Sequence, residues 1–179
     1  MKLNVLASSV LALVITGASS SVFAADAGSG TIEFNGTVNT GACTIVPSSV
    51  NKQVPLGSVP VASLQTAGSQ GPVSDFALEL TNCMLDPTNS GNLYSKVSVT
   101  FTGQMDPTGN LWASSGTAQN MGVLFEDPTA GVVLKNNDKV EQTLYAGNNT
   151  INLTARMQAL GAATAGSVKS TVAYVLDYQ

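Results

Sequence analysis

Few residues in this sequence of 179 residues could take part in catalysis, because it contains no histidine and only two cysteines. Without an imidazole, neither a Ser-His-Asp nor a Cys-His nucleophile can be assembled. Glu126 and Asp127 are adjacent, and neighbouring residues of a strand point to opposite faces, so they form a poor acid–base pair. The sequence therefore predicts no catalytic residue, and a protein that is not an enzyme.

Ion and phosphate sites are equally poorly supported. Two cysteine thiolates alone, without a histidine or a third thiol, make an unlikely metal site. Asp-Pro-Thr occurs three times, beginning at Asp86, Asp106 and Asp127, and a turn is favoured over a calcium ligand because proline fixes φ there. The glycines between residues 28 and 36 precede no helix, so they are no phosphate cradle. We expect neither a metal nor a cofactor.

Two side chains each leave two interpretations open. Arg156 is the only arginine, and a solvated or paired side chain is favoured over a catalytic one. Trp112 is the only tryptophan, and packing in the core is favoured over a platform for a sugar.

Residues 1–24 have the pattern of a secretory signal peptide, with Lys2, a short apolar run and small residues before a cleavage point after Ala24. Cleavage leaves 179 − 24 = 155 residues, the size of one domain. In an exported chain an even cysteine count favours a disulfide, here between Cys43 and Cys83, over a metal site. Closing a loop of about 40 residues would stabilise the fold by about 4 kcal/mol.

The charge of the exported chain is negative. Lys2 leaves with the signal, so six basic residues face eleven acidic ones, a net charge of −5. An acidic chain without a basic cluster argues against nucleic acid and anionic membranes as partners.

Strand and turn patterns dominate residues 25–179. Residues 75–82 alternate with Phe76, Leu78 and Leu80 on one face, and residues 96–102 alternate with Val97, Val99 and Phe101 inward. Further strands are expected at 42–46, 121–126, 132–135, 143–145, 150–158 and 168–178, while Pro55 and Pro60 place 54–57 and 59–64 at an edge or in loops. With no helix expected after the signal, the fold class is an all-β sandwich.

The stretch 25–38 alternates without a hairpin partner directly behind it. Its apolar or glycine face consists of Gly28, Gly30, Ile32, Phe34, Gly36 and Val38. Such a strand must complete a sheet elsewhere.

Four motifs, in this order, resemble those of the chaperone–usher fimbrial pilins, of the type 1-like major-subunit kind. They are Gly30-Thr-Ile-Glu-Phe-Asn-Gly-Thr-Val38 after the signal, Cys43 with Leu80-Thr-Asn-Cys83, Ala118-Gln-Asn-Met-Gly-Val123, and a C-terminus with Gly166 and a penultimate Tyr178. The resemblance spans essentially all residues after the signal.

The resemblance implies an incomplete immunoglobulin-like sandwich that lacks its last strand, with an N-terminal donor-strand extension. The expected organisation is a signal peptide (1–24), the extension (25–41) and the pilin domain (42–179). The missing strand exposes a hydrophobic groove, which a periplasmic chaperone and then the extension of the next subunit would fill. Ile32 and Phe34 would each contribute about 1.5–3 kcal/mol when buried there.

The resemblance also assigns the C-terminal strand to the border of this groove. Gly166, Tyr174, Leu176 and Tyr178 would form its edge or contact the chaperone, and the Gln179 carboxylate would meet basic chaperone residues. Packing of the aromatic residues in the subunit's own core is the simpler alternative.

The leading hypothesis is a structural subunit of a fimbria that polymerises by donor-strand exchange and supports surface adhesion. Its partners would be identical or homologous pilins, a periplasmic chaperone and an outer-membrane usher, on a route through the periplasm to the cell surface without membrane insertion. The alternatives are a minor tip or adaptor pilin, and a secreted monomeric β-sandwich that binds carbohydrate.

Overall fold

The computed structural model describes residues 30–36, 41–86 and 93–179. The chain divides into two units, residues 1–37 and 38–179. In the first unit, residues 30–36 are exposed and have no regular secondary structure. The expected signal peptide lies outside the described residues, so the boundaries expected at residues 24 and 41 stay predictions.

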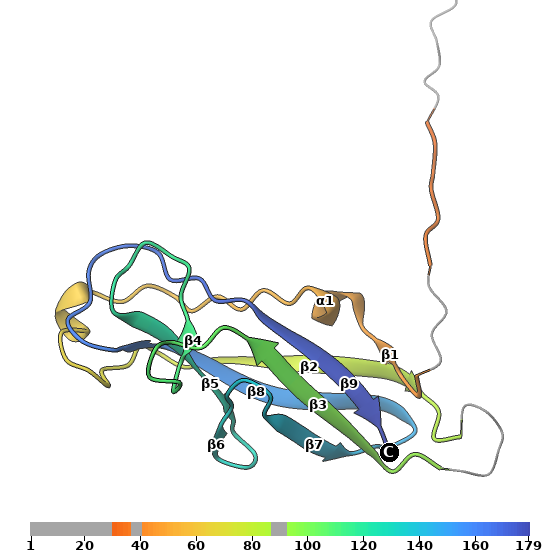
Figure 1. Ribbon diagram of the computed structural model, residues 1–179. Coiled ribbons are helices and arrows are strands. Elements are labelled where there is room, and N and C mark those ends of the chain that lie inside the picture. The colour runs from red at the N-terminus through yellow and green to blue at the C-terminus, as the bar shows by residue number, and fades with distance from the viewer. Residues whose placement is uncertain (1–29, 37–40, 87–92) are drawn as a thin grey trace, which may run out of the picture. The chain divides into compact units, whose positions relative to one another are not determined.

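The second unit is a sandwich of two antiparallel sheets (Figure 1). The larger sheet has the order β1 (Thr44–Ile45), β2 (Ser74–Cys83), β8 (Gly147–Ala159), β5 (Met121–Asp127) and β4 (Trp112–Ala113), and β6 (Val132–Val133) also pairs with β5. The smaller sheet has the order β7 (Lys139–Thr143), β3 (Lys96–Gly103) and β9 (Val172–Tyr178). The all-β sandwich predicted from the sequence is therefore confirmed.

The core lies between the two sheets. Val97, Val99 and Phe101 of β3 are buried, as the alternation predicts. Phe125 of β5 packs edge-on against Phe101, with ring centroids 4.9 Å apart, and stacks on Phe76 of β2 at 5.8 Å. Aromatic pairs at these separations add to the energy of burial, so one phenylalanine cluster joins the sheets.

A disulfide ties the beginning of the sandwich to the end of β2. Cys43 and Cys83 are bonded, with their Cα atoms 4.1 Å apart. Next to this bond Thr44 of β1 pairs with Thr81 of β2. The predicted disulfide is confirmed.

Several predicted element boundaries are wrong. The first correction concerns helices, because residues 47–50 form α1 (Pro47–Val50) and residues 61–63 form the 3₁₀ helix η1 (Val61–Ser63). α1 begins at Pro47, whose fixed φ suits the first helical position, and η1 directly follows Pro60, which is its N-cap. The strand expected at 143–145 ends instead at Thr143, as β7, and the one expected from 168 begins at Val172. No described helix is long and apolar enough to cross a membrane.

Candidate functional site: an open groove beside the last strand

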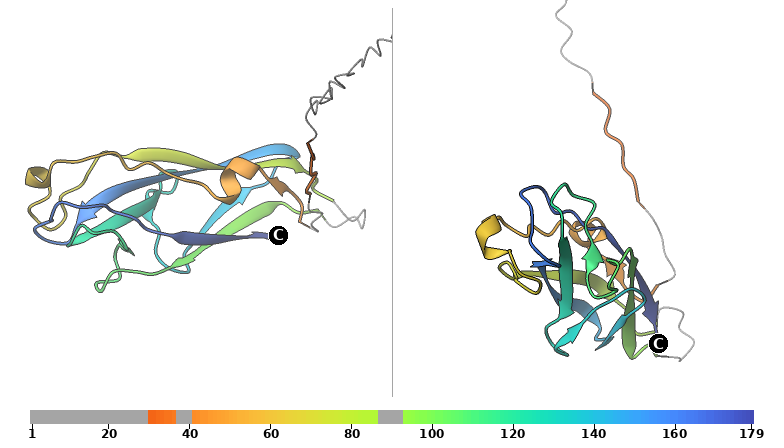
Figure 2. Two further views of the ribbon diagram at one scale, coloured as in Figure 1. Left: turned by 90° about the horizontal axis from the view of Figure 1, so that it is seen from above. Right: turned by 60° about the vertical axis from the view of Figure 1, so that its left-hand side comes forward.

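A groove with a volume of about 1140 Å³ opens on one side of the sandwich, between the segments 50–64 and 163–174. The first segment leads from α1 to η1, and the second leads from the loop after β8 into β9 (Figure 1). Figure 2 shows both segments from two further directions. We call these segments the first wall and the second wall.

Hydrogen bonds join the walls at both ends. At one end the hydroxyl of Tyr174 donates to the carbonyl of Ser49, which directly precedes the first wall, at 2.8 Å. At the other end the amide of Ala163 donates to the carbonyl of Leu64 at 3.0 Å. Residues 50–63 and 164–173 are described throughout, and no hydrogen bond joins them to one another. The walls are therefore held at their ends and stand open between them.

The floor of the groove is the hydrophobic core itself. Side chains of both sheets line it, including Phe76 of β2, Phe101 of β3 and Phe125 of β5. Met121 and Met157 line it near the η1 end, where they pack with Leu64. Apolar surface that faces water is unfavourable in proportion to its area, so an apolar occupant would be strongly stabilised here.

The second wall offers a free strand edge. Lys96 and Gln179 exchange two backbone hydrogen bonds of 2.9 Å, so by the alternation of antiparallel pairing Ala173, Val175 and Asp177 also bond to β3. Before β9, the carbonyls of Ser167 and Lys169 accept from Ala118 and Ser115 at 3.0 and 2.7 Å.

These bonds all use odd-numbered residues of the second wall. From residue 168 on, the even-numbered backbone groups face the groove, and they have no partner among the described residues. They belong to Val168, Ser170, Val172 and Tyr174. The side-chain hydroxyl of Ser170 is buried and also lacks a partner in the described part of the chain. An unpaired edge of this kind is a template for another strand.

Gly166 holds the second wall against residues 117–118. A Cβ atom at this position would lie 2.4 Å from the amide nitrogen of Ala118 and 2.7 Å from the carbonyl carbon of Thr117. Only glycine permits so close an approach of two backbones. This contact gives a physical reason for the glycine that the sequence singles out near the C-terminus.

The structure separates the predicted edge residues into two groups. Gly166 and Tyr174 line the groove. Leu176 and Tyr178 pack against the core beyond it, and the backbone of Gln179 pairs with Lys96. Burial raises the pKa of Tyr174, and burial also raises the pKa of Tyr178 although a hydrogen bond from the backbone of Cys43 opposes it. Contact of these residues with a chaperone stays a prediction.

The predicted donor residues from Gly28 to Gly36 lie in the first unit. Ile32 and Phe34 are 81% and 90% exposed, and Gly30 and Gly36 have no atom near the position of a Cβ. Gly28 and Val38 lie outside the described residues. Their role as a donor strand stays a prediction. Sequence reasoning missed that residues 50–64 form a wall; their two prolines, which lack an amide hydrogen, were the available signal.

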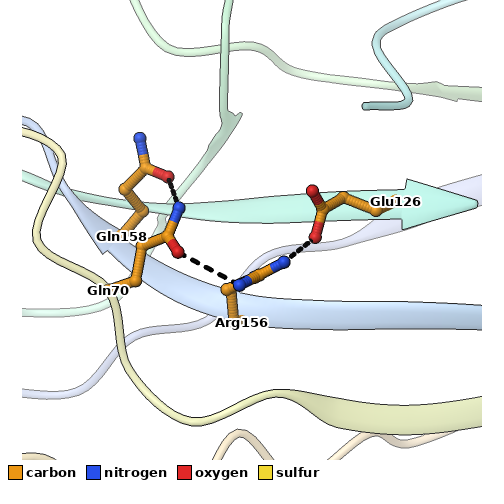
Figure 3. Close-up of polar contacts among 4 residues, drawn as sticks. All are labelled: Gln70, Glu126, Arg156 and Gln158. Atoms are coloured by element: carbon orange, nitrogen blue, oxygen red, sulfur yellow. Dashed lines mark hydrogen bonds and ion pairs between the residues drawn. The ribbon is translucent and has the colours of Figure 1, made fainter. Parts of the chain in front are cut away.

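Arg156 takes part in a polar row on the outer face of the larger sheet (Figure 3). Its guanidinium pairs with Glu126 and donates to Gln70 Oε1 at 3.1 Å, and Gln70 in turn donates to Gln158 at 2.8 Å. The interpretation of Arg156 as a paired side chain is confirmed.

Trp112 and the turn at Asp106 are structural as well. Trp112 has no exposed surface, and its indole nitrogen donates to the carbonyl of Leu134 at 2.8 Å, so a sugar platform on Trp112 is not available. Burial raises the pKa of Asp106, but hydrogen bonds from Thr108, Leu111 and Asn110 outweigh it and hold the pKa below its usual value. The described residues hold no group of three or more Asp, Glu, His or Cys that could bind a metal.

Fold and groove together define an immunoglobulin-like β-sandwich that is open along one side. The chain belongs to the fimbrial protein family, whose family model matches residues 32–179. It is a structural subunit of a fimbria.

Relatives and a solved structure agree with this assignment. The major MR/P fimbria protein of Proteus mirabilis is 34% identical and the type-1 fimbrial protein A chain of Escherichia coli is 33% identical, each over the whole of both chains. A solved chaperone–usher pilus, studied for the uncoiling of its rod, matches 86% of this chain and 97% of its own with a TM-score of 0.71 and 25% identity.

Proposed function

We propose that this subunit polymerises by donor-strand exchange, in which residues 28–38 of one copy occupy the groove of the next. The observation that carries the proposal is the open groove, because it combines an apolar floor with an unpaired strand edge. Strand addition uses these two elements, main-chain hydrogen bonds for affinity and pockets for alternate side chains for specificity.

The lengths of donor and groove support this pairing. The second wall between its hydrogen-bonded ends, residues 164–173, comprises ten residues, and the donor stretch 28–38 comprises eleven. Fully extended, they span about 33 and about 36 Å. A strand of this length fills the groove from one closed end to the other.

The side chains of the donor match the floor. Ile32 and Phe34 are almost fully exposed in their own unit, and burying each would contribute about 1.5–3 kcal/mol. The polar face of the donor, with Thr31 and Asn35, would then point to solvent. The contact is head to tail between unlike surfaces and does not close, so it generates a filament.

The open groove also explains why export of the subunit to the cell surface would need a chaperone and an usher. During passage through the periplasm a chaperone strand fills it and prevents aggregation along the free edge. An outer-membrane usher then allows the donor of the next subunit to replace that strand, and the fimbria that forms at the cell surface supports adhesion.

Removing the donor tests the proposal. Deletion of residues 25–36 should abolish filaments in electron micrographs of cells while a secreted, folded subunit remains detectable. A second variant, Ile32→Ser with Phe34→Ser, keeps the length of the extension and should also fail to assemble. Filaments of normal length from either variant would contradict donor-strand exchange.

A further inference from the structure

The charges along the groove have one sign. Lys52 of the first wall and Lys169 of the second wall line it, and no aspartate or glutamate of the described residues does. This is unexpected in a chain with eleven acidic and seven basic residues. The groove is thus a positive region on an acidic molecule.

The donor stretch carries the opposite charge. Residues 25–38 contain Asp26 and Glu33 and no basic residue. Two surfaces of opposite charge attract one another before contact, which accelerates association and disfavours wrong alignments.

One of these charges lies at the middle of the donor stretch, and another lies at the middle of the second wall. Glu33 is the middle residue of 28–38, and Val168 and Lys169 are the two middle residues of 164–173. Val168 packs inward, so a donor that fills the groove with Ile32 and Phe34 inward places the outward Glu33 opposite Lys169, whether the strands run parallel or antiparallel.

Both side chains would lie on the same surface of the completed sheet. Val168 packs into the core, so the next residue, Lys169, points outward. Glu33 likewise lies on the face opposite to Ile32 and Phe34. Two opposite charges on facing positions of neighbouring strands stabilise that pairing.

Other alignments lose this contact. A shift by two residues, the smallest that keeps Ile32 and Phe34 inward, places Glu33 opposite Ser167 or Thr171, which are uncharged. Further shifts toward the C-terminus bring Glu33 closer to Asp177, a like charge on the same face of β9.

We propose that Glu33 of the incoming copy pairs with Lys169 and thereby fixes the register of the donor strand, and that Lys52 and Lys169 together speed its capture. This inference rests on the proposed donor-strand exchange. It adds the interaction that selects one alignment of the donor strand in the groove.

The inference can be tested with a labelled peptide of residues 25–38. The measurement is the kinetics of its binding to the refolded mature chain. Raising the ionic strength from 0.05 to 0.5 M should lower the association rate constant about three-fold or more. Lys169→Glu should weaken binding about five-fold or more, and the peptide variant Glu33→Lys should restore most of that loss. Lys139→Glu, on β7 and outside the groove, is the control with the same charge change and should have little effect.

A disulfide scan measures the register directly. A Thr31→Cys peptide should link to Thr171→Cys in an antiparallel complex or to Ser167→Cys in a parallel one, and not to Ala165→Cys or Ala173→Cys. Adding Glu33→Gln to the peptide should spread the links to these neighbouring positions.

The outcomes separate the two proposals. If the wild-type peptide binds but Lys169→Glu behaves like Lys139→Glu, or the links do not spread, the charge pair is wrong and donor-strand exchange stands. If the wild-type peptide does not bind at all, donor-strand exchange is wrong and this inference is overturned with it.

Discussion

The hydroxyl of Tyr174 donates a hydrogen bond of 2.8 Å to the backbone carbonyl of Ser49, from the edge strand of one sheet to the helix that packs on the other. The hydroxyl oxygen of Ser49, which is fully buried, accepts a bond of 3.0 Å from the amide of Glu79 in β2. One serine thus connects β2 and β9 and closes the groove at the end near α1.

Tyr174→Phe should destabilise the subunit by about 1 kcal/mol, because it removes this hydrogen bond and leaves a buried carbonyl with one partner fewer. Urea unfolding followed by the fluorescence of Trp112, the only tryptophan, measures the change. Tyr145→Phe is the control, because Tyr145 is 64% exposed. Equal unfolding midpoints for the two variants would show that the bond contributes nothing.

Alkaline pH should weaken the same end of the groove. Burial raises the pKa of Tyr174 in the folded state, so the neutral phenol is favoured by folding. This contribution is fully present below about pH 10, the ordinary tyrosine value, and is lost as the pH rises through the folded pKa. The free energy of unfolding should therefore decline above that pH, and less steeply in Tyr174→Phe. Identical slopes in both proteins would contradict this assignment.

Gly166→Ala should destabilise the subunit by about 1–3 kcal/mol, because the new methyl group overlaps the backbone of Ala118 and must displace the second wall. Thermal unfolding provides the measurement. Gly161→Ala, in the same loop, is the matched control because its Cβ would meet no atom closer than 3.9 Å. Similar melting temperatures for the two variants would mean that the wall tolerates the shift.

Phe34→Arg should slow or abolish exchange between subunits, because an arginine cannot enter an apolar groove without losing its hydration. The stability of the sandwich should not change, since Phe34 is 90% exposed, and chaperone binding should be largely retained. Filament yield and urea unfolding are measured together, with Asn35→Arg on the outward face as the control. Loss of both stability and assembly would place Phe34 in the subunit's own core.

Much of the sandwich follows from local patterns. The alternation of 75–82 and 96–102 predicts both strands and their buried faces, because a residue's neighbours two positions away share its side of a sheet. The alternation could not predict the short helices α1 and η1, since each comprises a single turn. Pro47 begins α1 and Pro60 precedes η1, and both prolines also suit a loop.

The groove itself depends on contacts that no local pattern contains. Its closed ends join Ser49 to Tyr174 and Leu64 to Ala163, residues about one hundred positions or more apart. The family resemblance predicted that a groove exists and named Gly166 and Tyr174 at its edge. It could not show that residues 50–64 form the opposite wall, or that both walls contribute a lysine.

Phe76, Phe101 and Phe125 serve at once as core and as groove floor. A strand that binds in the groove adds its binding free energy to the stability of the subunit. By mass action, its free energy of unfolding rises with the concentration of whatever strand fills the groove. A subunit alone in dilute solution is then the least stable form of the chain, and one that has a neighbour on its groove side is the most stable.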